Sequence, residues 1–220
     1  MSSSLWSAVT WDIARAGGMV AYVLLSLSVT LGLALSMRWQ RPRWPRLITN
    51  DLHSFVTLLS LVFVGIHVLA VWLDPYMRFA WQDILIPLAS SYRPLWMAAG
   101  IVGTYLMLAV WISTQLRSRI GYTWWRRLHV LTFFVYLFST VHGLGTGTDT
   151  RQAWALELYA GSFLLIGALT INRLLTPIGK NGRGHPRLAA LTALIVVVGM
   201  AWAATGPAHA GWSAIANHLL

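Results

Sequence analysis

Six long apolar runs dominate this sequence and limit what the chain can fold into. Hydrophobic residues make up 57% of its 220 residues, and charged residues only 10%. A soluble domain of this size could not keep so much apolar surface out of water, whereas a bilayer is itself an apolar solvent. The runs lie near residues 17–37, 52–73, 95–116, 128–144, 153–175 and 188–204. We therefore predict an all-α, polytopic membrane protein, with six transmembrane helices in a single domain over residues 1–220.

Helices are expected because an open strand would leave backbone groups unpaired in lipid. A helix needs roughly 20 residues to cross a hydrocarbon core of about 30 Å, and we expect the shorter runs 128–144 and 188–204 to include flanking residues. Residues 1–18 carry no basic segment before the first run. We therefore expect no cleaved signal peptide, and a first run that remains as a helix.

The formal net charge of +10 comes from basic residues in short segments between the apolar runs. This pattern orients membrane proteins, and it does not form the single patch that nucleic acid would require. Twelve of the 16 basic residues follow the first, third and fifth runs: Arg38, Arg41, Arg43, Arg46, Arg117, Arg119, Arg126, Arg127, Arg173, Lys180, Arg183 and Arg187. The positive-inside rule places these segments in the cytoplasm and predicts a plasma (inner) membrane protein of bacterial type with both termini outside.

Four histidines lie inside two of the apolar runs. His53 and His67 occupy positions i and i+14, and His129 and His142 occupy positions i and i+13. An ionisable side chain inside a membrane helix is costly and indicates a functional site. The two runs cross in the same direction, because one run lies between them. If their helices are neighbours, the histidines form two facing pairs at two depths, each able to hold a flat haem between two imidazoles.

The two spacings differ in helical phase. A spacing of i, i+14 returns to within about 40° of the starting face, whereas i, i+13 leaves a difference of about 140° on an ideal helix. We therefore predict a tightened turn within residues 131–141, or a loosening of the helix where His142 precedes the glycines at 143, 145 and 147.

The chain contains no cysteine, which excludes disulfides, thiolate-ligated haem and iron–sulfur clusters. Histidine is then the only strong haem ligand. His185, His209 and His218 fall in loop or tail sequence, and we predict surface positions for them. A haem with two histidine ligands has no open iron position, so we expect it to relay electrons instead of binding oxygen.

These histidine spacings resemble the ferric reductase-like transmembrane family, which includes the NADPH oxidases. The segment STQLRSRIGYTWWRRLH, residues 113–129, is similar to the corresponding part of the haem subunit of the bacterial methionine sulfoxide reductase system. The resemblance covers nearly the whole chain. It implies two haem b groups between the helices at 52–73 and 128–144, an inner haem on His53 and His129 and an outer haem on His67 and His142.

Arginines at the ends of the runs are candidate partners of the haem propionates, because their guanidinium groups bind carboxylates in bidentate fashion. For the inner haem these are Arg46, Arg126 and Arg127, and for the outer haem Arg93 and Arg151.

Three glycines, Gly65, Gly100 and Gly103, are small enough to let a porphyrin approach a helix. General helix packing is the favoured interpretation of these small residues.

The sequence therefore predicts transfer of single electrons from the cytoplasmic side to an outer acceptor such as a ferric chelate, oxygen or a periplasmic protein. It contains no glycine-rich dinucleotide fingerprint. We expect a separate flavoprotein dehydrogenase or a quinol to supply the electrons, so any oxidoreductase activity requires that donor, and no catalytic residue is assigned. An alternative is a membrane haem subunit that feeds a separate periplasmic oxidoreductase. A histidine-based proton or metal transporter is a distant third, because Glu157 is the only acid within the runs.

Overall fold

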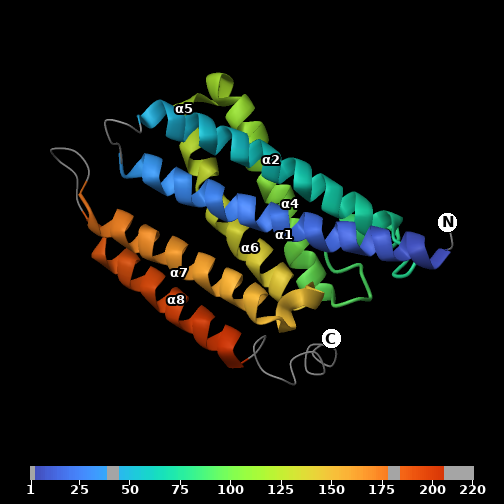
Figure 1. Ribbon diagram of the computed structural model, residues 1–220. Helices are drawn as coiled ribbons and strands as arrows, with labels where there is room; N and C mark the ends of the chain where they lie inside the picture. Colours follow the sequence, from blue (N-terminus) through green and yellow to red (C-terminus); the bar gives the residue numbers. More distant parts are fainter. Residues whose placement is uncertain (1–2, 39–44, 178–183, 206–220) are drawn as a thin grey trace. The chain divides into compact units, whose positions relative to one another are not determined.

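The computed structural model describes residues 3–38, 45–177 and 184–205 (Figure 1). Every regular element in these ranges is helical. The elements are α1 (Ser3–Ser36), α2 (Arg46–Leu73), α3 (Trp81–Leu85), α4 (Pro94–Gln115), α5 (Arg117–His129), α6 (Thr132–Thr146), the 3₁₀ helix η1 (Thr148–Arg151), α7 (Ala153–Leu175) and α8 (Pro186–Thr205). The all-α prediction is confirmed for this part of the chain.

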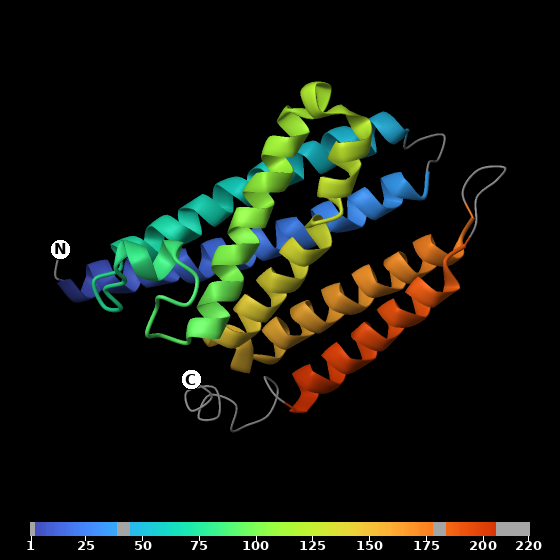
Figure 2. The same ribbon diagram turned by 180° about the vertical axis from the view of Figure 1, so that it is seen from behind.

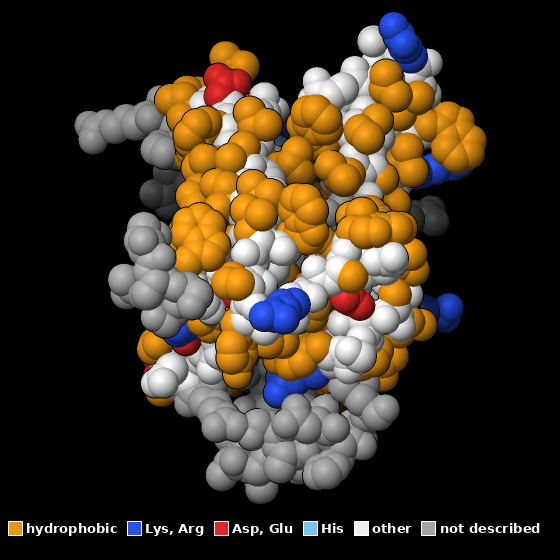
Figure 3. Space-filling view, turned by 90° about the vertical axis from the view of Figure 1, so that its right-hand side faces the viewer, with side chains coloured by type: hydrophobic (Ala, Val, Ile, Leu, Met, Phe, Trp, Pro, Cys, Tyr) orange, Lys and Arg blue, Asp and Glu red, His pale blue; other side chains and the backbone are white. Residues whose placement is uncertain are grey.

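Four helices are long and apolar enough to cross a membrane: α1 from Trp6 onward, α2, α4 and α7. The bent pair α5 and α6 would make a fifth span, and α8 contributes a shorter apolar helix over Pro186–Trp202. Hydrophobic side chains cover much of the described surface on the face shown in Figure 3, as expected for helices solvated by lipid. The described helices thus support a multi-pass membrane protein, while the number of six spans stays a prediction.

The chain packs as two compact units, and the long helices α1 and α2 each pass from one unit to the other. The first unit holds α1 up to Val23 and the segment from Leu59 to Thr148, which includes the second half of α2 and all of α3 to α6. Among the described residues, the second unit holds 24–38, 45–58, 149–177 and 184–205, and thus α7 and α8.

In the first unit, α1 and α2 run antiparallel, and polar side chains fix their register. The Ser60 hydroxyl donates to the Ala21 carbonyl at 3.0 Å, and the Thr10 hydroxyl donates to the buried Asp74 carboxylate at 3.3 Å. Hydrogen bonds of this kind satisfy polar groups that have no water available. Helices α4 and α6 lie side by side (Figures 1 and 2).

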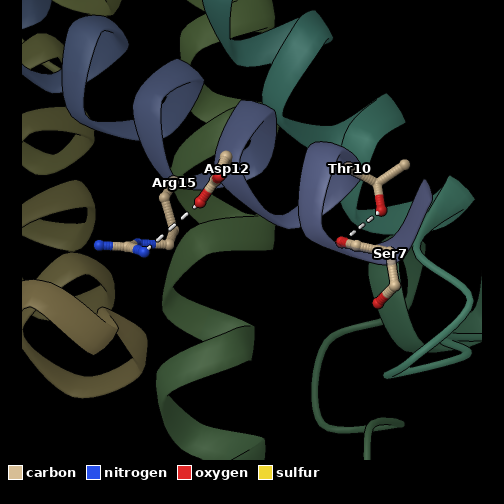
Figure 4. A network of polar contacts seen from close by, with 4 residues as sticks. All are labelled: Ser7, Thr10, Asp12 and Arg15. Carbon is tan, nitrogen blue, oxygen red and sulfur yellow. Dashed lines mark hydrogen bonds and ion pairs between the residues drawn. The ribbon is translucent and has the colours of Figure 1, made fainter. Parts of the chain in front are cut away.

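Helix α1 begins at Ser3, well before the predicted run at 17–37. Asp12 and Arg15 interrupt the apolar sequence, but they form an i, i+3 ion pair at 3.6 Å on the helix surface (Figure 4). The Thr10 hydroxyl also returns a hydrogen bond to the Ser7 carbonyl at 3.0 Å. These local contacts satisfy the polar groups within the helix, so the charges do not end it.

The predicted run at 128–144 is divided between two helices. The pair α5 and α6 bends by 42°, and the backbone amides of Leu131 and Phe133 donate to carbonyls only three residues earlier, at 3.0 and 3.2 Å. These three-residue bonds tighten the turn in the sense that the i, i+13 histidine spacing predicts, since they overwind a helix. The turn overlaps only the start of the predicted interval 131–141, and His142 lies within regular helix in α6.

Helix α5 itself was not predicted, because its sequence is basic and polar. Its arginines pack on aromatic rings: the guanidinium of Arg117 lies 4.4 Å from the ring centre of Trp125, and that of Arg127 lies 5.1 Å from the ring centre of Trp124. Gly121 interrupts the helix with φ 80° and ψ 160°, a conformation that is almost restricted to glycine.

In the second unit, α7 packs against α8 through small residues, and the two helices lie side by side in both ribbon views. Gly167 faces Val196, and Gly199 faces the ring of Phe163, where an added Cβ would come within 2.8 Å. Close approach at glycine is the usual basis of helix association in lipid.

Candidate functional site

His67 and His142 form a facing pair in the first unit. His67 lies on α2 and His142 on α6, and the centres of their imidazole rings are 6.2 Å apart with an angle of 78° between the ring planes. Both side chains are half-buried. The structure thus brings together the two histidines that the sequence predicts for the outer haem.

Each ring is held through Nδ1 by a backbone carbonyl of a different helix. Nδ1 of His67 lies 2.7 Å from the Ala14 carbonyl of α1, and Nδ1 of His142 lies 2.9 Å from the Trp96 carbonyl of α4. A carbonyl only accepts, so Nδ1 carries the proton and donates in both cases. Nε2 is then the nitrogen with the lone pair that a metal needs.

The distance between the rings fits one metal shared by both. A bond from a metal to an imidazole nitrogen is about 2 Å long, and the ring centre lies about 1.2 Å beyond that nitrogen. Two imidazoles on opposite sides of one metal therefore have ring centres about 6.4 Å apart, against the 6.2 Å seen here. The residues present fit a group with two axial histidines, such as haem.

The contact between α4 and α6 around Trp96 positions the His142 side of the site. An added Cβ on Gly145 would overlap the Trp96 ring, so this glycine lets the indole pack directly against α6. Nη1 of Arg93 donates to the Gly145 carbonyl, and Arg93 itself adopts a left-handed conformation with φ 44° directly before α4. These contacts fix the Trp96 carbonyl that receives His142.

His53 lies in the second unit and is held in the same way as His67. Its Nδ1 donates to the Ser28 carbonyl of α1 at 2.9 Å, and the Ser28 hydroxyl lies 2.6 Å from the Thr57 hydroxyl. His67 donates to the carbonyl of Ala14, and His53 donates to that of Ser28. These two acceptors occupy positions i and i+14 on α1. The two histidines have the same separation on α2, as an antiparallel pair of helices requires.

His129 ends α5 in the first unit and has different surroundings. Its half-buried ring packs against Trp125, with ring centres 5.0 Å apart, and the indole of Trp125 donates to the Thr114 hydroxyl at 3.2 Å. His53 and His129 belong to different units. Their pairing around an inner haem stays a prediction.

The predicted propionate arginines occupy different surroundings. Arg93 is half-buried beside the end of α6, whereas Arg46, Arg126 and Arg127 are exposed at helix ends. The side chain of Arg151 lies outside the described residues. His185 is exposed directly before α8, as predicted, whereas His209 and His218 lie outside the described residues.

Within the described ranges, no three side chains of His, Asp or Glu converge on a point that would hold a metal ion. Axial ligation of haem requires only two. Sequence patterns alone did not single out the acceptor carbonyls, or Gly18 and Gly32 of α1. These glycines share the i, i+14 spacing of His53 and His67, and this common spacing was the available signal.

The sequence matches the family of ferric reductase-like transmembrane components over residues 17–140, more than half of the 220-residue chain. The matched region includes His53, His67 and His129 and ends two residues before His142. Domains of this family generally bind haem. Comparisons with curated proteins and with solved structures gave no significant match.

Proposed function

Because the chain belongs to the family of ferric reductase-like transmembrane components, we propose that it is a di-haem membrane cytochrome of b type. The family indicates electron transfer across a membrane. The observation that carries the finer proposal is the His67–His142 pair, whose ring centres are separated as one shared iron would require. In this proposal Nε2 of each ring ligates the outer haem, and the carbonyls of Ala14 and Trp96 hold the rings in the required tautomer.

His53 and His129 hold the inner haem in this proposal. Support for His53 comes from its Nδ1, which donates to a carbonyl of α1 as that of His67 does. Bound haem supplies reversible one-electron chemistry at iron. The chain supplies the axial ligands, the apolar helices that exclude water, and arginines for the propionates: Arg46, Arg126 and Arg127 for the inner haem, Arg93 and Arg151 for the outer.

The direction of transfer is from the cytoplasm to the outer side, with both termini outside. Support comes from the distribution of basic residues, which the positive-inside rule assigns to the cytoplasm. A flavoprotein dehydrogenase or a quinol delivers electrons on the cytoplasmic side. The acceptor meets the outer haem and is either a small oxidant, such as a ferric chelate, or a separate periplasmic oxidoreductase.

The assignment of the outer haem is tested with His67→Ala and His142→Ala, each purified in detergent and assayed for haem per chain. Each variant should lose one of two haems, because a single remaining imidazole cannot complete the axial pair. His185→Ala is the matched control, since His185 lies outside the pair, directly before α8, and its loss should leave the haem content unchanged. Retention of both haems in His67→Ala and His142→Ala would refute the assignment.

A further inference from the structure

Three histidines share one local construction. The imidazole of each lies against a glycine of a neighbouring helix, and its Nδ1 donates to the carbonyl four residues before that glycine. For His67 the carbonyl is that of Ala14 and the glycine is Gly18, and for His142 they are Trp96 and Gly100. The same offset of four recurs for His53, which contacts the carbonyl of Ser28 and Gly32.

The offset has a simple basis in helix geometry. In an α-helix the carbonyl of residue i bonds to the amide of residue i+4, so a side chain at i+4 stands beside that carbonyl. Glycine at i+4 removes this side chain and opens the carbonyl to a second donor. An imidazole can then lie on the helix surface and donate its Nδ1 proton there.

The available space at these glycines is small. A Cβ on Gly100 would lie 2.5 Å from Nδ1 and 2.7 Å from Cε1 of His142. A Cβ on Gly18 would lie 2.9 Å from Nδ1 and 3.1 Å from Cε1 of His67. The approach to Nδ1 is too short for non-bonded atoms in both cases, so an alanine at either position must turn or displace the imidazole.

We propose that Gly18 and Gly100 are positioning residues of the His67–His142 site, which set the orientation of the two imidazole planes. The inference rests on the proposed function, because the two rings act through the iron they share. Each glycine keeps its histidine against one carbonyl, and the two carbonyls belong to different helices, α1 and α4. The planes are thereby fixed at 78° to each other.

The angle between axial imidazole planes has a direct spectroscopic consequence. Crossed planes place two iron d orbitals close in energy, and a low-spin ferric haem then gives an electron paramagnetic resonance spectrum with one prominent feature at low field. Parallel planes separate the orbitals and give a rhombic spectrum with three resolved features. The spectrum reports ring orientation in the oxidised protein and does not depend on activity.

The test compares wild type with Gly18→Ala and Gly100→Ala in the full chain, after haem per chain has been measured. Wild type should show a low-field feature from a haem with crossed ligands. Gly100→Ala should shift that feature or convert it to a rhombic signal, and Gly18→Ala, with the less severe overlap, should cause a smaller change. Loss of one haem from either variant, with helical content retained, would also support displacement of its histidine.

Gly161→Ala is the matched control. Gly161 lies on α7 in the second unit, and a Cβ there would meet nothing within 4 Å. This control should keep both the haem content and the spectrum of wild type. The inference is overturned if Gly100→Ala and Gly18→Ala retain an unchanged spectrum, or if Gly161→Ala changes it equally. A wild-type protein without haem would instead overturn the proposed function.

Discussion

Tyr22 and Tyr136 illustrate how single polar groups are accommodated between apolar helices. Both side chains are buried, their rings stack with centres 5.8 Å apart, and the Tyr22 hydroxyl donates to the Tyr136 hydroxyl at 3.1 Å. The Tyr22 hydroxyl also lies 3.1 Å from the Thr140 hydroxyl. A hydroxyl transferred into an apolar interior without a partner is costly, so these groups are placed together. The cluster joins α1 to α6 within the unit that holds His67 and His142.

At this scale we expect Tyr22→Phe to destabilise the protein by about 1 kcal/mol, because the Tyr136 and Thr140 hydroxyls each lose a partner in a non-aqueous interior. The midpoint of thermal unfolding in detergent measures the effect. The double variant Tyr22→Phe, Tyr136→Phe should cost less than the sum of the two single changes, since it removes both ends of one bond. Strict additivity would contradict the coupling.

At the scale of elements, the sequence was most informative where lipid determines the outcome. The α7 run at 153–175 coincides with Ala153–Leu175, because apolar composition alone selects a membrane helix. Composition could not show that α5 is helical, since cation–π contacts between arginines and aromatic rings stabilise this basic segment. Nor could it place the bend before α6, which depends on hydrogen bonds between backbone groups.

For the candidate site, the similar depths of the histidines along two helices that run in the same direction predicted that His67 would pair with His142, and the family resemblance implied the same pair. The contacts of the rings could not be predicted from the sequence. The register between antiparallel helices decides which carbonyl and which glycine each imidazole contacts. The matched spacing of Gly18 and Gly32 becomes meaningful only when α1 is known to pack against α2.

Gly121 gives a test at the same scale. Its backbone angles, φ 80° and ψ 160°, are almost exclusive to glycine, so Gly121→Ala should cost about 1–3 kcal/mol through strain alone. A Cβ there would meet nothing within 4 Å, which separates strain from steric overlap. Gly161→Ala is the control in the α7 helix: its site is equally open, and the change should be neutral or stabilising by up to about 1 kcal/mol. Equal midpoints of thermal unfolding for Gly121→Ala and Gly161→Ala would contradict the strain assigned to the backbone at Gly121.

At the scale of the whole molecule, the proposed direction of electron transfer depends on topology. The chain has no cysteine, so single cysteines can report sidedness without a background. Ser91 and Ser118 are exposed at opposite ends of α4. In spheroplasts, Ser91→Cys should react with a membrane-impermeant maleimide from outside, whereas Ser118→Cys should react only after the membrane is opened. The reverse pattern would invert the proposed direction.

The most direct test of the central claim is a reduced-minus-oxidised absorption spectrum of the purified protein, with dithionite as reductant and haem quantified per chain. We predict the spectrum of low-spin b-type haem at two haems per chain, as two pairs of axial histidines require. A protein that stays colourless after haem supplementation would contradict the electron-transfer account. A single haem per chain would contradict the two-site arrangement.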